Sequence, residues 1–268
     1  MAHYELGVIG AGNMAEAILH GVIRGKFLPP SAVVAADVSA ARREKLARDL
    51  GIACVEDNAL AAASRRVLLA VKPQVMAAVL EQAAPHVQAD AVVISIAAGV
   101  TTQFLDEKLH HRGRLIRVMP NTPMLAGAGM SALTAGPRAT ARDMQWATRL
   151  FAASGQTVVV EESMMDAVTA VSGSGPAYFF YLIEALIEAG AAEGLSHDVA
   201  TTLAVATCSG AARLLAESRE APEVLRARVT SPNGTTQRAI ETMEAAGVKA
   251  ALVKAVRAAA ARSRELGQ

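Results

Sequence analysis

The chain has 268 residues, 52% of them hydrophobic, which is enough for one large or two ordinary domains with their own cores. Its 26 basic and 25 acidic residues leave a net charge of +1. Bulk electrostatics therefore favour neither nucleic acid nor an anionic membrane as a partner, and we expect small-molecule partners.

The N-terminal residues 1–5 lead almost at once into an apolar strand, which leaves no room for a signal peptide and predicts a cytoplasmic protein. Cys54 and Cys208 fit no metal or redox spacing, so we expect two reduced structural thiols and no metal site. The longest apolar run, residues 177–187, is interrupted by Glu184, and we expect no membrane-spanning segment.

A glycine-rich turn follows the short apolar strand at residues 6–9 and leads into a helical pattern. Gly10 permits a tight turn, Gly12 has no side chain to hold a pyrophosphate away from the backbone, and Ala15 allows the helix to pack closely on the strand. The free N–H groups of the helix start would face the phosphates. Glycine pairs also occur in ordinary turns, but a strand before and a helix after this one predict a dinucleotide-binding turn.

The first half of the chain alternates β-branched runs with helical patterns, which predicts parallel strands joined by crossover helices. Near residue 163 the pattern changes to Ala- and Leu-rich helices without a convincing strand. We therefore predict an α/β, Rossmann-type doubly wound sheet over residues 1–162, followed by an all-α domain over residues 163–268. Strands are expected at 32–37, 67–71, 91–96, 115–119 and 157–160, with helices at 40–50, capped by Ser39, and at about 140–154.

The helices of the second half are apolar on more than one side, as residues 178–183 and 203–206 show. A domain of this size has a limited core with which to cover so much apolar surface. We expect a homo-oligomer built on a dimer with intertwined C-terminal helices, with a tightly folded monomer as the alternative.

Asp37 ends the second predicted strand, where an acid usually accepts hydrogen bonds from the adenosine ribose of NAD. Ser39, Arg42 and Arg43 follow, and they could instead hold the 2′-phosphate of NADP. A third alternative is a helix-capping Asp37 followed by solvated arginines. The sequence leaves these alternatives open.

Other polar residues follow the later strands, on the side of the sheet where ligands bind. Asn58 approaches a cofactor or begins a helix. Lys72 contacts a ligand or is a surface lysine beside the helix-initiating Pro73. Asn121 and Thr122, between two prolines, are placed to hydrogen-bond a ligand amide or ring.

Two motifs in the second half have the form of helix starts. Ser174 is expected to be an N-cap, with Pro176 in the first turn. Residues 229–236 form a turn into a helix whose free N–H groups would suit a carboxylate.

Together these motifs resemble the pyrroline-5-carboxylate reductases nearly end to end. The resemblance implies hydride transfer from NAD(P)H to the C=N carbon of 1-pyrroline-5-carboxylate, giving L-proline, the last step of proline biosynthesis. It also implies a homodimer or a ring of dimers, with the active site between one subunit's nucleotide domain and the partner's helices. The segments that carry the resemblance are residues 10–15, 70–73, 95–100, 117–123, 172–178 and 230–236.

The resemblance implies roles for individual residues. Thr236, Ser174 and Lys72 would be catalytic, with the Thr236 hydroxyl contacting the ring nitrogen. The backbone amides of residues 234–236 would hold the substrate carboxylate, in a substrate site made of Gly175, Pro176, Ser231, Gly234, Thr235 and Thr236. The cofactor, NADPH with NADH as the alternative, would contact Gly10, Gly12, Asn13, Met14, Asp37, Ser39, Arg42, Asn58, Val71, Lys72, Pro73, Ala97, Asn121 and Thr122.

Two residues depart from the family pattern. Asn233 replaces a usual glycine, although asparagine tolerates positive φ better than most residues. Asp37 is unexpected in an enzyme that commonly prefers NADPH.

Two other functions stay open. A β-hydroxyacid-type dehydrogenase would share the glycine turn but should depend on a catalytic lysine, and Lys249 and Lys254 lie late in the chain, far from residues 172–176. A catalytically silent nucleotide-binding protein is the second alternative.

Overall fold

The computed structural model describes residues 4–266, which form two compact units. The sheet unit consists of residues 4–174 together with residues 259–266, and the helical unit consists of residues 175–258. The chain therefore passes between the units twice.

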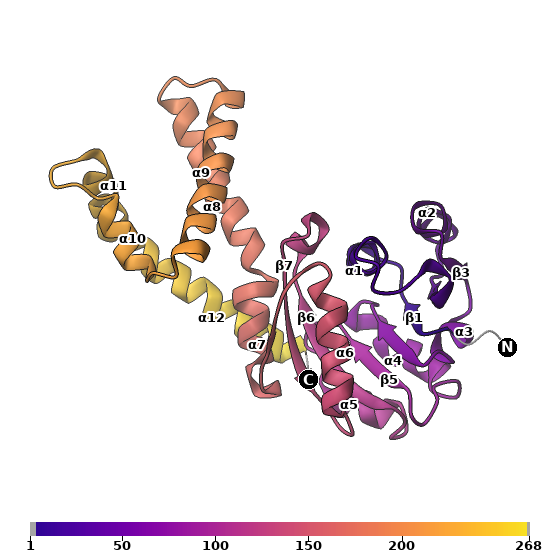
Figure 1. Cartoon of the computed structure of the whole chain (residues 1–268). Helices are drawn as coiled ribbons and strands as arrows, with labels where there is room; N and C mark the ends of the chain where they lie inside the picture. Colours follow the sequence, from indigo (N-terminus) through magenta and orange to yellow (C-terminus); the bar gives the residue numbers. More distant parts are fainter. Residues whose placement is uncertain (1–3, 267–268) are drawn as a thin grey trace. The chain divides into compact units, whose positions relative to one another are not determined.

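The sheet unit begins as the sequence predicts, with strands and helices in alternation (Figure 1). The predicted helix at residues 40–50 and its Ser39 cap are confirmed, as is the helix expected at about 140–154. Its strands are β1 (Leu6–Ile9), β2 (Val33–Ala36), β3 (Ala53–Val55), β4 (Arg66–Leu69), β5 (Val92–Ser95), β6 (Arg114–Pro120), β7 (Gly129–Ala135) and β8 (Gly155–Val159). Its helices are α1 (Asn13–Arg24), α2 (Ala40–Leu50), α3 (Asn58–Ala62), α4 (Pro73–Ala83), α5 (Thr102–Lys108), α6 (Ala141–Ala152) and α7 (Met165–Val168), with short 3-10 turns at Pro30–Ala32, Thr122–Ala126 and Glu162–Met164.

The eight strands form one sheet in the order β3-β2-β1-β4-β5-β6-β7-β8. From β3 to β6 all neighbouring strands are parallel, and the order reverses direction between β1 and β4. This is the doubly wound arrangement, which leaves a crevice beyond the carboxyl ends of β1 and β4.

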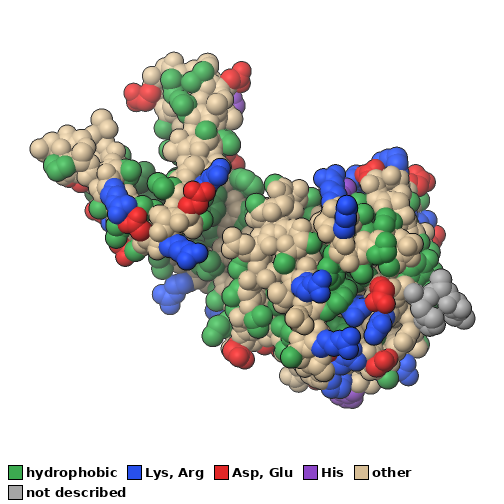
Figure 2. All heavy atoms as spheres, in the orientation of Figure 1, with side chains coloured by type: hydrophobic (Ala, Val, Ile, Leu, Met, Phe, Trp, Pro, Cys, Tyr) green, Lys and Arg blue, Asp and Glu red, His purple; other side chains and the backbone are tan. Residues whose placement is uncertain are grey.

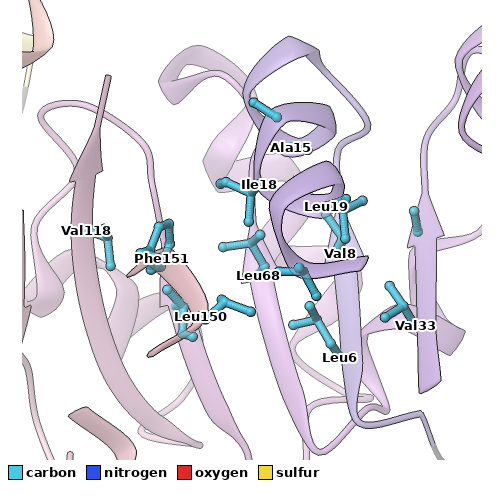
Figure 3. Packing of buried hydrophobic residues seen from close by; sticks show 14 of the residues in the cluster. Leu6, Val8, Ala15, Ile18, Leu19, Val33, Leu68, Val118, Leu150 and Phe151 are labelled. Atoms are coloured by element: carbon cyan, nitrogen blue, oxygen red, sulfur yellow. The ribbon is translucent and has the colours of Figure 1, made fainter. Parts of the chain in front are cut away.

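Alternation along the strands places two hydrophobic clusters on opposite faces of the sheet. Leu6 and Val8 belong to one cluster, and Ile9 belongs to the other. Figure 3 shows the first cluster, in which Ile18 and Leu19 of α1 point toward the sheet, while Leu150 and Phe151 of α6 pack farther along it. Both helices are thereby fixed against the same face.

The sequence analysis gave no bounds for two strands, β3 and β7. β3 is a three-residue edge strand, too short for a periodic signal. β7 has the sequence GMSALTA, which is rich in small residues, and it pairs antiparallel with β6. We expected parallel strands throughout this domain. The antiparallel pairing of β6 with β7 shows that this expectation is wrong for these two strands.

The helical unit contains no strand among its residues, as expected. Its helices α8 and α9 pack side by side (Figure 1), and both expose large apolar side chains, including Phe180 at 59% and Tyr181 at 76%. Figure 2 shows hydrophobic side chains along the surface of these helices. The helices of this unit are α8 (Gly175–Ala192), α9 (His197–Ser218), α10 (Pro222–Arg228), α11 (Thr235–Ala245) and most of α12 (Val248–Leu266).

Ser174 is not an N-cap, which corrects the sequence-based expectation. Its φ of −84° and ψ of −21° are helical, whereas an N-cap has extended dihedrals. A π-helical turn at Thr169–Gly173 leads into α8, so the chain is helical almost without a break before Pro176. The Pro176 position near the start of α8 is confirmed.

Two helical stretches, residues 162–192 and 197–218, are long and apolar enough to span a membrane by length and composition. The expectation of no membrane-spanning segment rested on the length of the apolar run at residues 177–187 alone. Both helical stretches are longer than that run, so this length argument is wrong. Only 11% of the most apolar window of each stretch is buried within the chain. Such exposed helices also occur where subunits associate.

The C-terminal end of α12 belongs to the sheet unit. Ser263 is buried, and its hydroxyl donates a hydrogen bond of 2.6 Å to Asp166 at α7. This contact ties the last turns of the chain to the segment that follows β8.

The start of α6 is stabilised by a charged contact from the sheet. Asp143 forms a capping box with Thr140, and Arg114 of β6 donates to both Asp143 oxygens at 2.7 and 3.1 Å. The Asp143 side chain is only 8% exposed. Burial raises the pKa of Asp143, but hydrogen bonds from Arg114 and Thr140 outweigh it and hold the pKa below its usual value.

We expect Arg114→Gln to lower the free energy of unfolding at neutral pH by about 2 kcal/mol, because the nearly buried carboxylate loses its cation. A depressed folded-state pKa stabilises the fold above the unfolded pKa, and the stabilisation is lost as pH falls through the folded value. The difference between wild type and variant should therefore shrink below about pH 4 in chemical unfolding experiments. Arg48→Gln, at an exposed position, is the control. A difference that stays constant into strong acid would contradict this account.

Candidate active site

The predicted cofactor residues gather at one edge of the sheet. Parallel pairing of β1, β4, β5 and β6 places their carboxyl ends together, at the edge that includes the reversal of strand order. The residues that follow these strands are Gly10, Gly12, Asn13 and Met14 after β1, Val71, Lys72 and Pro73 after β4, Ala97 after β5, and Asn121 and Thr122 after β6.

The glycine turn has the form that a phosphate group needs. Gly10 has a φ of +96°, and a Cβ there would lie 2.8 Å from the carbonyl oxygen of Ala70, so only glycine fits. At Gly12 a Cβ would meet nothing within 4 Å, so the space beside it is open. Gly12 is also the N-cap of α1 and provides no side-chain cap, which leaves the first N–H groups of α1 for an oxyanion. These residues fit the pyrophosphate of a dinucleotide.

Asp37 and Arg42 hold the glycine turn through the peptide groups of Ala11. The Asp37 carboxylate accepts hydrogen bonds from the N–H groups of Ala11, at 2.7 Å, and of Ser39, at 2.8 Å. The Arg42 Nε donates to the Ala11 carbonyl oxygen at 2.6 Å. Asp37 and Arg42, which the sequence analysis assigned to the ribose and the 2′-phosphate, therefore stabilise the turn through hydrogen bonds.

Glu16 completes this charged network. Its carboxylate binds Arg42 at 2.8 Å and also pairs with Lys45. Burial raises the pKa of Glu16, but hydrogen bonds from Lys45 and Arg42 outweigh it and place the pKa below its usual value. Arg43 donates to the carbonyl oxygen of Asp37. These arginines are thus bound to the protein, unlike the solvated arginines of the third alternative.

Lys72 is the N-cap of α4, provides no side-chain hydrogen bond to the helix and is exposed. Pro73 is the first residue of α4, which confirms the helix-initiating role. A cavity of about 200 Å³ lies next to this helix start, lined by Pro73, Gln74, Phe104, Leu266 and residues 99–101. The loop after β5 thus borders an open space at the same edge as the glycine turn.

Asn121 links three segments of the sheet unit and is only 8% exposed. Its side-chain oxygen accepts a hydrogen bond of 2.8 Å from the Met130 N–H. Its amide nitrogen donates to the carbonyl and hydroxyl oxygens of Ser172, at 3.3 and 3.4 Å. Thr122, by contrast, is exposed. Asn121 therefore fixes the turn after β6 against the Ser172 motif, a role that the sequence spacing did not reveal.

Asn58 lies at the first position of α3, next to the Asp57 cap, so the helix-start alternative is confirmed. Its amide donates to Gln82 at 3.3 Å. This contact joins α3 to α4 and leaves the Asn58 backbone at an exposed helix start.

The second predicted site, the turn at residues 231–236, lies in the helical unit. α11 begins at Thr235, and its N-cap Gly234 provides no side-chain cap. Asn233 adopts a φ of +60°, so the left-handed turn survives without the usual glycine. A Cβ on Gly234 would lie 2.5 Å from the Ser231 hydroxyl oxygen and 3.0 Å from its carbonyl oxygen, so a larger residue here would crowd Ser231.

The N–H groups of this turn are not equivalent. The Gly234 N–H already donates to the Ser231 carbonyl oxygen at 3.0 Å. The Asn233 N–H donates to the Gln237 side chain at 2.7 Å. The N–H groups of Thr235 and Thr236, in the first turn of α11, are therefore left without a helical hydrogen-bond partner.

Within residues 4–266, no group of three or more His, Cys, Asp or Glu side chains is arranged to hold a metal ion. Cys54 and Cys208 are both free and half-buried, as expected. Burial raises the pKa of Cys54 and keeps its thiol protonated at neutral pH.

Two family models match separate ranges of the chain. Residues 162–266 match the family model described as pyrroline-5-carboxylate reductase dimerisation. Residues 5–99 match the model described as NADP oxidoreductase, coenzyme F420-dependent. The dimerisation match covers both of the long apolar helical stretches.

Solved structures show the same fold over the whole chain. A pyrroline-5-carboxylate reductase from Coxiella burnetii superposes with a TM-score of 0.92 at 34% identity, and one from Plasmodium falciparum with NADP bound superposes with a TM-score of 0.90 at 28% identity. Both cover 100% of this chain and of their own. A prephenate dehydrogenase from Aquifex aeolicus, 14% identical with a TM-score of 0.55, shares the fold alone.

Curated relatives agree. Pyrroline-5-carboxylate reductase of Pseudomonas aeruginosa is 42% identical over 270 residues, covering 100% of this chain and 98% of its own. That of Methanosarcina acetivorans is 40% identical over 269 residues, covering 100% of both chains. With full-length identity at this level, the chain belongs to the pyrroline-5-carboxylate reductase family.

Proposed function

We propose that this protein reduces 1-pyrroline-5-carboxylate to L-proline with NADPH, the last step of proline biosynthesis. The observation that carries the proposal is the presence of two helices with a glycine N-cap, Gly12 at the turn before α1 and Gly234 at the turn before α11, which leave the first N–H groups of each helix uncapped. The first suits a dinucleotide and the second a small carboxylate. The full-length relatives named as this reductase support the assignment.

We assign the cofactor to the carboxyl edge of the sheet. The α1 start would hold the pyrophosphate, Asp37, Ser39 and Arg42 the adenosine ribose and its 2′-phosphate, and Lys72, Ala97, Asn121 and Thr122 the nicotinamide end. The match to an NADP oxidoreductase model and the NADP-bound relative favour NADPH over NADH. The same assignment includes Asn13, Met14, Asn58, Val71 and Pro73 as neighbours of the cofactor.

We assign the substrate to the α11 start. The N–H groups of Thr235 and Thr236 would bind the carboxylate, because those of Asn233 and Gly234 have partners within the turn. Gly234 and Ser231 would then act by shaping the turn. Ser174, Gly175 and Pro176 would border the substrate ring.

The reaction needs positioning more than a strong acid. A protonated cyclic imine is already electrophilic, so its carbon accepts a hydride without activation by a metal. The reduced nicotinamide supplies that hydride. The protein would hold the carboxylate at the α11 start, while the Thr236 hydroxyl would hydrogen-bond the ring nitrogen, whose charge changes during reduction.

We expect Thr236→Val to lower kcat with 1-pyrroline-5-carboxylate by about a hundredfold, because the side chain keeps its shape but loses the hydroxyl. Thr236→Ser, which restores the hydroxyl, should recover most of the activity. The oxidation of NADPH, followed by its absorbance, measures both variants. Unchanged turnover in Thr236→Val would remove this residue from the mechanism, whereas an inactive wild type would overturn the proposed reaction.

A pair of glycine variants tests the cofactor site. Gly12→Ala adds a methyl group where the protein leaves open space, so we expect a nearly unchanged melting temperature but at least about tenfold weaker NADPH binding. Gly10→Ala should lower the melting temperature, because its Cβ meets the Ala70 backbone. Titration of cofactor fluorescence with NADPH and NADH measures binding, and wild type should bind NADPH more tightly. Equal binding by wild type and Gly12→Ala would place the pyrophosphate elsewhere.

We also propose that the chain works as a cytoplasmic homodimer or ring of dimers, with residues 1–162 as the nucleotide domain and 163–268 as the substrate and dimerisation domain. The match of residues 162–266 to a dimerisation model and the exposed apolar side chains of α8 and α9 support association. Sedimentation velocity should show a dimer or larger species, and a monomer at micromolar concentration would contradict this.

A further inference from the structure

A second group of polar side chains lies at the opposite edge of the sheet from the glycine turn. β4, β5 and β6 begin there, and their register places Arg66, Val92 and Arg114 in one row across the three parallel strands. Residues in such a row project to the same face of the sheet. Two arginines of the sheet therefore flank one valine on a single face.

α6 contributes two more arginines and a tryptophan beside this row. Arg142, Trp146 and Arg149 have helical spacing that places them along one side of α6. These residues, together with the strand row and Arg65, line a hollow of about 250 Å³. Figure 2 shows Lys and Arg side chains over the part of the sheet unit where α6 lies in Figure 1.

The acids at this hollow do not neutralise its five arginines. Asp143 is the acidic residue in the lining, and Arg114 occupies both of its oxygens. Glu5 pairs with Arg66, and more distantly with Arg65 at 3.6 Å. Within the described residues 4–266, Arg142 and Arg149 form no ion pair. The local charge is thus strongly positive in a chain whose net charge is +1.

Arg66 is held in place by its surroundings. Its guanidinium lies over the Trp146 ring, 4.2 Å from the centroid, and Trp146 packs in turn against Phe27. Burial lowers the pKa of Arg66, and the charge of Arg65 lowers it further, although Glu5 offsets part of the effect. A negatively charged ligand in the hollow would relieve this repulsion.

We propose that this arginine hollow binds a small multivalent oxyanion, of the diphosphate or polycarboxylate kind. Guanidinium groups match the oxygens of both anions in a fork geometry, and several of them together favour more than one negative charge. The hollow is small and bounded by one helix and the sheet, which suits a compact anion. Since it lies at the opposite edge from the glycine turn, the inference does not rest on the proposed function.

The test is calorimetric titration of the full chain with pyrophosphate and, in a second arm, with citrate, both at low ionic strength. The test variant is the double substitution Arg142→Gln and Arg149→Gln, at two exposed positions that contribute no ion pair to the described fold. The matched control is Arg48→Gln with Arg213→Gln, which removes the same charge from exposed sites elsewhere. The arms show which anion the hollow prefers.

We expect wild type and control to bind at least one anion, and the test variant to bind it at least about tenfold more weakly. Binding should weaken as salt is added but persist with NADPH present. Equal affinity in all three proteins, or binding that NADPH abolishes, would overturn the proposal by placing the anion elsewhere. An absence of binding to wild type would overturn it outright.

Discussion

The peptide groups of Ala11 are the point on which the carboxyl edge of the sheet depends. Asp37 accepts the N–H of Ala11, and Arg42 donates to its carbonyl oxygen, so two oppositely charged side chains hold one residue of the glycine turn. Glu16 and Lys45 fix Arg42 from the other side. The turn is therefore preorganised by side chains that follow β2 and lie on α2.

Much of the fold follows from local pattern. The glycine turn, the Ser39 cap and the buried strands have short-range signals, and the structure has them where they were expected. β7 escaped detection because its small residues lack a strand signature, although it pairs antiparallel with β6, the strand before it in the chain. Ser174 was misjudged because its π-helical surroundings continue the helix through a Ser- and Gly-rich sequence that usually breaks one.

The site shows the same division between local and distant information. Sequence spacing indicated which residues follow which strands, and the parallel sheet brings them to one edge. It could not show that the side-chain nitrogen and oxygen of Asn121 both form hydrogen bonds within the protein. Nor could it show that the Gly234 N–H donates to a carbonyl oxygen of its own turn. The arginine hollow could not be predicted either, because strand register brings Arg66 and Arg114 into one row while Arg142 and Arg149 come from α6.

The return of α12 to the sheet unit has a consequence for co-translational folding. Residues 259–266 are synthesised after the whole helical unit, yet Ser263 is the partner of Asp166. The strands and helices before residue 174 can assemble while the chain is still growing. The contact between Ser263 and Asp166 must wait until the intervening helical unit, residues 175–258, has been synthesised and has left the exit tunnel.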